Sequence, residues 1–291
     1  MTLISLKPKN KVLSKIGAKM SLDSIGKQKP TLLKHNIEPN HNSPTINSFE
    51  EWYKLASQVR SIDLGRHLLY YIFQPVFDAL SNGWVTSNNR KKTIEALDKI
   101  VAVSKEYYAA YYLKKADTAK IRQLAKEIKP VILKIDRYYY KQRNIDHNNI
   151  FPEHIGKFLA SFIDHLENKK IQYPDIIIGC ACGSAEIAMS LSGLLKIPLE
   201  FIRKSKRRAD ENPVLIEEQQ QRIIKNCKGK NLLIIEDYVV TGRSMEAISQ
   251  LCSKFGSKNI QGASINTCGI EVTSLSLEIN EKKFQIYNYK K

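Results

Sequence analysis

The sequence has few cysteines, no long apolar run and too few acidic side chains to balance its basic ones. Its five cysteines are an odd number, and all of them lie after residue 179. This usage argues against a disulfide framework and for a reducing cytosol. The most apolar stretch, Leu68 to Leu80, is interrupted by polar residues and is shorter than the roughly 20 residues that a membrane span needs. The first residues lack the basic start and apolar core of a secretory signal, so we expect a cytoplasmic protein without a membrane segment.

The shortage of acids gives the 291-residue chain a net charge of +17, from 46 Lys and Arg against 29 Asp and Glu. Counted by segment, the excess is +6 over residues 1–45, +7 over 46–170 and +4 over 171–291. The excess is therefore spread out, and it is densest in residues 1–45, which are rich in Lys, Asn, Ser and Pro. A tail of this composition is more often a mobile arm than a dedicated nucleic-acid grip, so we expect a flexible basic segment there.

Residues 46–150 carry a helical pattern and no strand signal of comparable strength. Apolar residues from Trp52 to Leu64 recur every three or four positions, and Ser48 precedes them as a helix cap. We expect a helical domain here that serves either as a hood over a site or as a partner-binding part. The further helices predicted from this pattern cover residues 89–112, 117–140 with a break near Pro130, and 152–166.

Tyrosines crowd this helical domain, in pairs such as Tyr107-Tyr108 and Tyr111-Tyr112. Two interpretations are open. Interleaved with cations, the rings could stack bases along a basic groove. Alternatively, they line a helix-packing face and point their hydroxyls to water. We favour the second interpretation, because aromatic residues at helical spacing are usually core.

After residue 172 the pattern changes to short β-rich runs that alternate with helical stretches. This alternation predicts a parallel sheet with helices on its faces, and the ligands of such folds lie beyond the carboxyl ends of the strands. The last run, residues 273–289, predicts a C-terminal hairpin, so the α/β domain covers residues 151–291. Strands are expected at 175–178, 199–202, 232–235 and 260–265, and helices at 184–195 and 244–255.

One predicted strand-to-helix junction carries two adjacent carboxylates, Glu236 and Asp237, followed by a turn with hydroxyls and a glycine. Adjacent acids repel each other, and they are tolerated where sugar hydroxyls or a hydrated Mg²⁺ bind them. The turn offers backbone N–H groups, the hydroxyls of Thr241 and Ser244, and the positive end of a helix dipole, which together suit a phosphate. Carboxylates beside a phosphate cradle describe a site for a sugar 5-phosphate.

The run from Ile234 to Ser244 resembles the phosphoribosyl pyrophosphate (PRPP) binding motif of the type I phosphoribosyltransferases, in which an acid pair and Thr-Gly follow a strand. The resemblance implies a type I phosphoribosyltransferase-like α/β fold, a parallel sheet flanked by helices, here preceded by an all-helical N-terminal region. It also implies that Glu236 and Asp237 contact the ribose hydroxyls and meet Mg²⁺ indirectly, through water or PRPP. The following loop would hold the 5-phosphate through Val240, Thr241, Gly242, Arg243 and Ser244.

An earlier loop of small residues supports the resemblance. It follows the first predicted strand and opens a helix, so its backbone amides can approach an anion closely. It is similar to the pyrophosphate-binding loop of the family. The next strand ends in Arg203 and Lys204, two cations that suit a pyrophosphate and that, with Glu236 and Asp237, are the expected catalytic residues. The loop consists of Cys180, Ala181, Cys182, Gly183 and Ser184.

The chain departs from the family in three places. Val240 stands where members that use 6-oxopurines carry an acid, which argues against hypoxanthine or guanine as the acceptor. Residues 217–226 predict a helix where many members have a strand. The N-terminal helical region resembles no hood of the family.

Residues 205–213 agree with the family in position: they form a polar stretch where type I members have a mobile loop.

We therefore predict a Mg²⁺-dependent enzyme of nucleotide metabolism that transfers the 5-phosphoribosyl group of PRPP to an acceptor, a nitrogenous base, and releases pyrophosphate. The alternative is a regulator that senses PRPP or nucleotides with little or no catalysis and whose basic helical region binds nucleic acid. PRPP and a small-molecule acceptor are the expected partners, and a homodimer is left open. The sequence does not name the acceptor.

Overall fold

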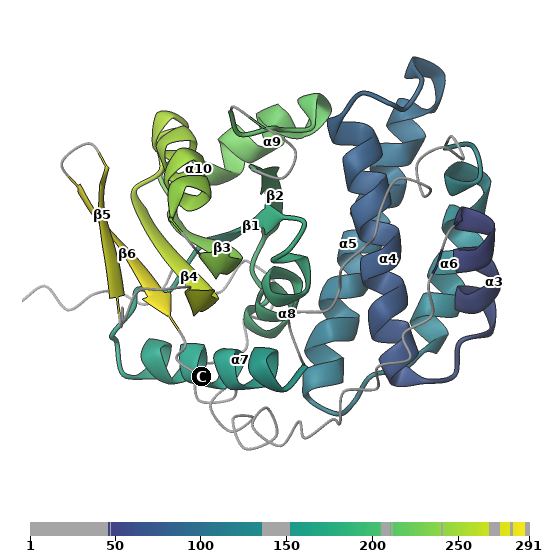
Figure 1. Cartoon of the computed structure of the whole chain (residues 1–291), viewed down its shortest axis with the longest axis horizontal. Coiled ribbons are helices and arrows are strands. Elements are labelled where there is room, and N and C mark those ends of the chain that lie inside the picture. Colours follow the sequence, from purple (N-terminus) through teal and green to yellow (C-terminus); the bar gives the residue numbers. More distant parts are fainter. Residues whose placement is uncertain are drawn as a thin grey trace, which may run out of the picture.

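The computed structural model places a group of helices beside an α/β sheet (Figure 1). The basic segment 1–45 and Val240 lie outside the described residues, as do Tyr138, Tyr139 and Tyr140. Within the described part of the chain, no helix is both long and apolar enough to cross a membrane. The described residues are 46, 48–135, 152–204, 210, 212–239, 241–267, 274–279 and 282–288.

The helical region begins with a helix that Ser48 caps as predicted. The Ser48 hydroxyl oxygen accepts a 3.0 Å hydrogen bond from the backbone N–H of Glu51. The predicted apolar run from Trp52 to Leu64 is not one helix, because the first helix ends at Gln58 and Ser61 caps a second one. The described helices of this region are α3 (Phe49–Gln58), α4 (Ile62–Ser81), α5 (Ser87–Tyr112) and α6 (Ala119–Ile132).

The tyrosine pairs of α5 lie in the core of the helical region. Tyr107 donates a hydrogen bond of 2.7 Å to the carbonyl of Ile62, and Tyr111 donates one of 2.7 Å to the carboxylate of Asp63. The predicted packing face is confirmed, but the expectation that the hydroxyls point to water is wrong. Rings buried in this way cannot stack bases. The tyrosines that are at most 1% exposed are Tyr107, Tyr108, Tyr111 and Tyr112.

The α/β part contains a six-stranded sheet of order β2-β1-β3-β4-β6-β5. All neighbouring pairs are parallel except β5 and β6, which pair antiparallel at the C-terminal end. This architecture, a parallel sheet flanked by helices and preceded by a helical region, confirms the predicted fold class. The elements are α7 (Pro152–Glu167), β1 (Ile176–Ala181), α8 (Ala185–Leu195), β2 (Leu199–Arg203), α9 (Glu217–Cys227), β3 (Asn231–Val239), α10 (Arg243–Lys254), β4 (Asn259–Thr267), β5 (Ser274–Ile279) and β6 (Lys282–Asn288).

Helices cover both faces of the sheet, which explains why its inner strands are apolar throughout. Ile176 and Ile178 of β1 pack in the core formed with α9 and α10, whereas Ile177 packs in the core formed with α7, α8 and the helical region. A helix at α9, where related chains were expected to have a strand, agrees with the sequence pattern. Because β1, β2 and β3 are parallel, their carboxyl ends meet at one edge of the sheet.

The helical region packs directly on the sheet through α5 and α8. A Cβ atom at Gly193 of α8 would overlap the backbone carbonyl of Lys105 and lie 2.8 Å from the Cβ of Ala109, so the two helices meet at a position that only glycine fits. The Lys105 ammonium donates a 3.1 Å hydrogen bond to the carbonyl of Ile197. This lysine, one of the cations interleaved with the tyrosines, therefore serves the contact between the two parts.

Buried charges also join the two parts. Arg66 of α4 contacts the Glu186 carboxylate of α8 at 2.5 Å, and the Tyr112 hydroxyl donates to the same oxygen at 2.5 Å. Leaving either charge of a buried pair alone costs several kcal/mol, of order 3 to 5. The polar contacts therefore hold the helical region in one orientation against the first turn of α8.

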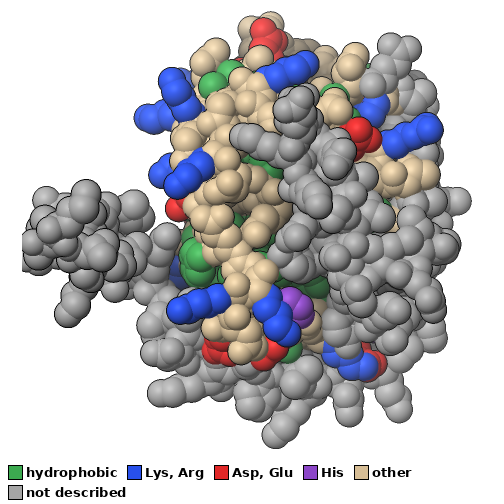
Figure 2. All heavy atoms as spheres, turned by 90° about the vertical axis from the view of Figure 1, so that its left-hand side faces the viewer, with side chains coloured by type: hydrophobic (Ala, Val, Ile, Leu, Met, Phe, Trp, Pro, Cys, Tyr) green, Lys and Arg blue, Asp and Glu red, His purple; other side chains and the backbone are tan. Residues whose placement is uncertain are grey.

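Basic side chains on the surface are dispersed, and several pair with acids. Lys99 contacts Glu127 at 2.8 Å, and Arg222 contacts Asp98 at 3.0 Å. On the face seen in Figure 2, described Lys and Arg side chains lie at scattered positions. The positive excess thus forms no single patch on the described part of that face.

His67 of α4 gives the interface a pH dependence. Burial, together with the positive charge of Arg66, lowers the pKa of His67 from 6.5 to about 4. The unfolded chain therefore takes up a proton that the folded chain resists, so the stability due to neutral His67 is complete above about pH 6.5 and declines toward pH 4. We expect His67→Gln to reduce the stability lost between pH 7.5 and 4.5 by about 2 kcal/mol, measured by urea denaturation. An unchanged pH dependence, or an imidazole that titrates near 6.5 by NMR, would contradict this account.

Candidate active site

A cavity of about 370 Å³ opens at the carboxyl edge of the sheet. The ends of β1 and β3, the residue after β2 and the start of α10 line it, so the sheet edge predicted to hold a ligand carries the cavity. The predicted site residues that line it are Cys180, Ala181, Cys182, Gly183, Lys204, Glu236, Asp237, Thr241, Gly242, Arg243 and Ser244.

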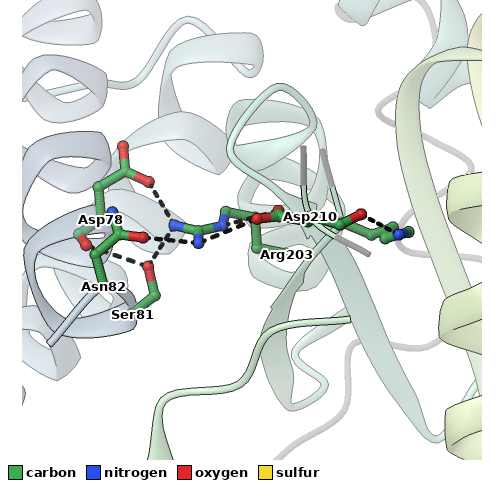
Figure 3. A network of polar contacts seen from close by, with 6 residues as sticks. Asp78, Ser81, Asn82, Arg203 and Asp210 are labelled. Atoms are coloured by element: carbon green, nitrogen blue, oxygen red, sulfur yellow. Dashed lines mark hydrogen bonds and ion pairs between the residues drawn. The ribbon is translucent and has the colours of Figure 1, made fainter. Parts of the chain in front are cut away.

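Two described residues of the predicted site do not line the cavity. Ser184 is fully buried, and its hydroxyl donates a 2.9 Å hydrogen bond to the carbonyl of Cys180, so it braces the loop from behind. Arg203 is 3% exposed and points toward the helical region (Figure 3). The structure thus separates Arg203 from the neighbouring Lys204, which does line the cavity.

The Arg203 guanidinium is fully engaged by other protein groups. A guanidinium has five N–H donors, and the five contacts seen here use all of them. Its partners on α4 are Asp78 at 3.3 Å, Ser81 at 2.7 Å and Asn82 at 2.9 Å. The carboxylate of Asp210 takes the other two donors, at 3.1 and 3.4 Å. No guanidinium donor of Arg203 remains for a pyrophosphate. The expected contact between Arg203 and this ligand is therefore not compatible with the observed hydrogen bonds.

The acid pair lies in an environment that opposes two negative charges. Burial raises the pKa of Glu236 well above its usual value, and the neighbouring Asp237 raises it further. Burial also raises the pKa of the Cys180 thiol, and the charge of Glu236 adds to this effect. Cys180 therefore stays a neutral thiol beside the acids. A ligand that shares or neutralises the charge of the pair, such as a hydroxyl donor or a cation, relieves the repulsion.

The first loop and the acid pair touch each other at Gly183. A Cβ atom on this residue would lie 2.6 Å from the carboxyl carbon of Asp237, closer than real Cβ atoms approach any atom. The peptide bond between Ala181 and Cys182 in the same loop is cis. Glycine at position 183 thus lets the loop after β1 and the end of β3 form one continuous wall of the cavity.

Helix α10 begins at the cavity without a side-chain cap, because its N-cap residue is Gly242. Gly242 has a φ of 72°, in the region that glycine favours, which turns the chain from β3 into α10. Uncapped N–H groups and the helix dipole attract anions. The cavity therefore offers one such helix start, at α10, close in sequence to the acid pair of β3.

The sequence prediction missed several residues near the site. Tyr238 is 44% exposed and lines the cavity, together with Val239 and Met245. These positions lie inside the recognised motif, but its spacing does not say which way they face. Tyr70 of α4 was also missed: burial and then the nearby Cys182 and Asp237 raise the pKa of its phenol well above the usual value. The helical region thus reaches the surroundings of the site.

The carboxylates at the cavity suit a metal ion that takes most of its ligands from elsewhere. In the described part of the chain, no three His, Cys, Asp or Glu side chains gather into a metal cage. Mg²⁺ usually binds one or two carboxylates and keeps water and substrate phosphates as its other ligands. Glu236 and Asp237, which line the cavity together, fit this mode.

Comparison with known proteins finds a family match over part of the chain. Residues 141–268 match the family model for the phosphoribosyl transferase domain. The matched range contains residues 234–244, whose motif resembles that of the same family.

Individual relatives are distant. Over 121 residues the chain is 30% identical to an orotate phosphoribosyltransferase of Oceanobacillus iheyensis. The aligned residues are 42% of this chain and 56% of that protein. A purine phosphoribosyltransferase from Pyrococcus horikoshii Ot3 shares 28% identity over 39% of this chain and 73% of its own, with a TM-score of 0.31. An adenine phosphoribosyltransferase shares 16% identity over 47% of this chain and 81% of its own, with a TM-score of 0.33.

The contact between Gly183 and Asp237 can be tested by a double-mutant cycle. Gly183→Ala introduces a methyl group that overlaps the carboxyl of Asp237. We expect it to lower the free energy of unfolding by about 1 to 3 kcal/mol. In an Asp237→Ala background, most of this loss should disappear, because the overlapping group is gone. An equal loss in both backgrounds, measured by urea denaturation, would show that the methyl group clashes elsewhere.

Proposed function

We propose that the chain is a phosphoribosyltransferase that transfers the 5-phosphoribosyl group of PRPP to a nitrogenous base and releases pyrophosphate. The domain match supports a transferase of nucleotide metabolism. The observation that carries the proposal is that one cavity brings together the loop of small residues after β1, the Lys204 cation, the acid pair of β3 and the uncapped start of α10. PRPP carries groups that suit each of them: a pyrophosphate, ribose hydroxyls and a 5-phosphate.

The chemical work of the site lies in positioning and in electrostatics. The loop after β1 and the Lys204 ammonium receive the pyrophosphate, and the turn at Thr241 and Gly242 receives the 5-phosphate. Between them Glu236 and Asp237 accept hydrogen bonds from the ribose hydroxyls. As the bond between C1 and the pyrophosphate oxygen breaks, its electron pair leaves with the pyrophosphate, where Lys204 and the loop amides stabilise the growing charge. The acceptor nitrogen then forms the new bond to C1 and loses its proton.

We propose Mg²⁺ as the cofactor of this reaction. Glu236 and Asp237 would hold it through water or through the hydroxyls of PRPP, as two carboxylates without a third protein ligand allow. When bound, the ion neutralises part of the negative charge of PRPP. It would also relieve the repulsion that raises the pKa of Glu236.

The acceptor we propose is a planar nitrogenous base. Tyr238 is partly exposed and lines the cavity together with the acid pair, and an aromatic side chain can pack against a heterocycle. The relatives are named as orotate and purine phosphoribosyltransferases. The chain spans only 56% of the length of the orotate enzyme. We therefore leave the particular base open.

The regulator with a nucleic-acid-binding helical region has less support. Its motivation was the net charge and the tyrosines of the helical region. The four tyrosines of α5 are buried, and Lys105 donates to a backbone carbonyl. Two further cations of the helical region, Lys99 and Lys120, pair with acids. The tyrosines of α5 therefore give this alternative no support.

Calorimetry with PRPP and Mg²⁺ tests the proposed function. We expect the wild-type chain to bind PRPP, and Asp237→Asn to weaken this binding about tenfold or more. The expected loss follows from the removal of a charged acceptor for a ribose hydroxyl, since hydrogen bonds to charged groups contribute about 1.5 to 3 kcal/mol.

The matched control is Glu106→Gln, which removes an exposed carboxylate that pairs with Lys120 on the far helices. It should leave PRPP binding unchanged. Absence of PRPP binding by the wild-type chain would sink the proposal. Equal binding by Asp237→Asn would remove the acid pair from it.

A further inference from the structure

Arg203 and Lys204 are adjacent cations that the structure uses in different ways. Arg203 has given all five of its donors to Asp78, Ser81, Asn82 and Asp210. A lysine ammonium has three donors, and Lys204 uses one of them on the backbone carbonyl of Asp210. Lys204 therefore keeps two donors for an anion in the cavity that it lines.

Asp210 connects the two cations. Both of its carboxylate oxygens meet the Arg203 guanidinium, at 3.1 Å to Nε and 3.4 Å to the terminal nitrogen, in the fork that fixes two planar groups relative to each other. Its side chain is 8% exposed, so solvent does little to weaken the pair. Its backbone carbonyl meanwhile receives the Lys204 ammonium.

The other side of Arg203 is anchored in the helical region. Asp78 is fully buried at the end of α4, and Ser81 and Asn82 follow it one turn later. The backbone of Arg203 is also fixed, because its N–H donates to the carbonyl of Val214 at 3.0 Å and its carbonyl accepts from the N–H of Val214 at 2.7 Å. A continuous chain of polar contacts thus runs from α4 through Arg203 and Asp210 to Lys204.

We propose that Asp210 is a positioning residue, held by Arg203 and α4, which keeps the Lys204 ammonium at the cavity where pyrophosphate leaves. The proposal rests on the proposed function for the identity of the anion. It gives the helical region a specific part in the site, the anchoring of Arg203 by α4. Arg203 acts through Asp210 and does not touch the substrate.

The direction of one mutational effect separates positioning from plain electrostatics. Asp210→Asn removes a negative charge near an anion site, so electrostatics alone predicts tighter binding of inorganic pyrophosphate. Positioning predicts the opposite: the fork with Arg203 is lost, the Asp210 carbonyl moves, and Lys204 is no longer held. We expect the Kd for inorganic pyrophosphate, measured by calorimetry on the full chain, to rise about fivefold to tenfold.

A double-mutant cycle tests whether Asp210 acts through Lys204. Lys204→Met should weaken pyrophosphate binding about tenfold or more, and the variant with both changes should bind no more weakly than Lys204→Met alone. The matched control is Asp98→Asn. Asp98 of α5 accepts hydrogen bonds of 3.0 and 3.1 Å from Arg222 of α9, at another contact between the helical region and the α/β part. It should leave the Kd unchanged. Additive losses in the double variant, or tighter binding by Asp210→Asn, would overturn the proposal.

A second readout keeps the positioning role separate from the proposed function. Acylation of lysines, followed residue by residue with mass spectrometry, should modify Lys204 more slowly in the wild type than in Asp210→Asn. If the wild type binds neither PRPP nor pyrophosphate and Lys204 still gains reactivity, the proposed function fails and the positioning role stands. Unchanged reactivity of Lys204 overturns the positioning role itself.

Should Asp210→Asn fail to fold, Ser81→Ala is a milder variant that removes a single acceptor of Arg203. It should raise the Kd for pyrophosphate and the reactivity of Lys204 in the same direction as Asp210→Asn, by a smaller amount.

Discussion

Arg203 joins the helical region to the sheet beside the cavity. Its guanidinium lies between Asp78 on one side and Asp210 on the other, in a place that excludes water. Without Arg203, a fully buried carboxylate at the end of α4 would lose this counter-charge, and breaking a buried pair in this way costs several kcal/mol. The backbone of Arg203 pairs with Val214, and its side chain holds Asp210, whose carbonyl receives the Lys204 ammonium.

The cavity itself depends on a second close contact, at Gly183. There the loop after β1 approaches the acid pair of β3 to a distance that leaves no room for a side chain. Burial raises the pKa of Glu236 in this environment, and the neighbouring Asp237 raises it further, so a ligand that shares the charge of the pair is favoured. The close approach at Gly183 and the acid pair are the features of the cavity on which the proposed function rests.

Local patterns predicted the α/β fold and most of the cavity, because periodicity and motif spacing act over short stretches of chain. The strand and turn around Glu236 and Thr241 carry their own signals in adjacent residues. The hydrogen-bond partner of a side chain carries no such local signal when it lies far away in the sequence. Arg203 looks like a free cation in the sequence, and its acceptors on α4 lie more than 120 residues away. The prediction that the tyrosine hydroxyls point to water was wrong for the same reason, because their acceptors lie on other helices.

The central claim is that this cavity transfers a phosphoribosyl group, and turnover tests it most directly. The full-length chain would be incubated with PRPP, Mg²⁺ and a panel of purine and pyrimidine bases, and the products followed by mass spectrometry. The account predicts release of pyrophosphate together with an equal amount of a new nucleotide for at least one base, and loss of both products in Asp237→Asn. PRPP that remains intact with every base, under conditions where calorimetry shows it bound, would contradict it.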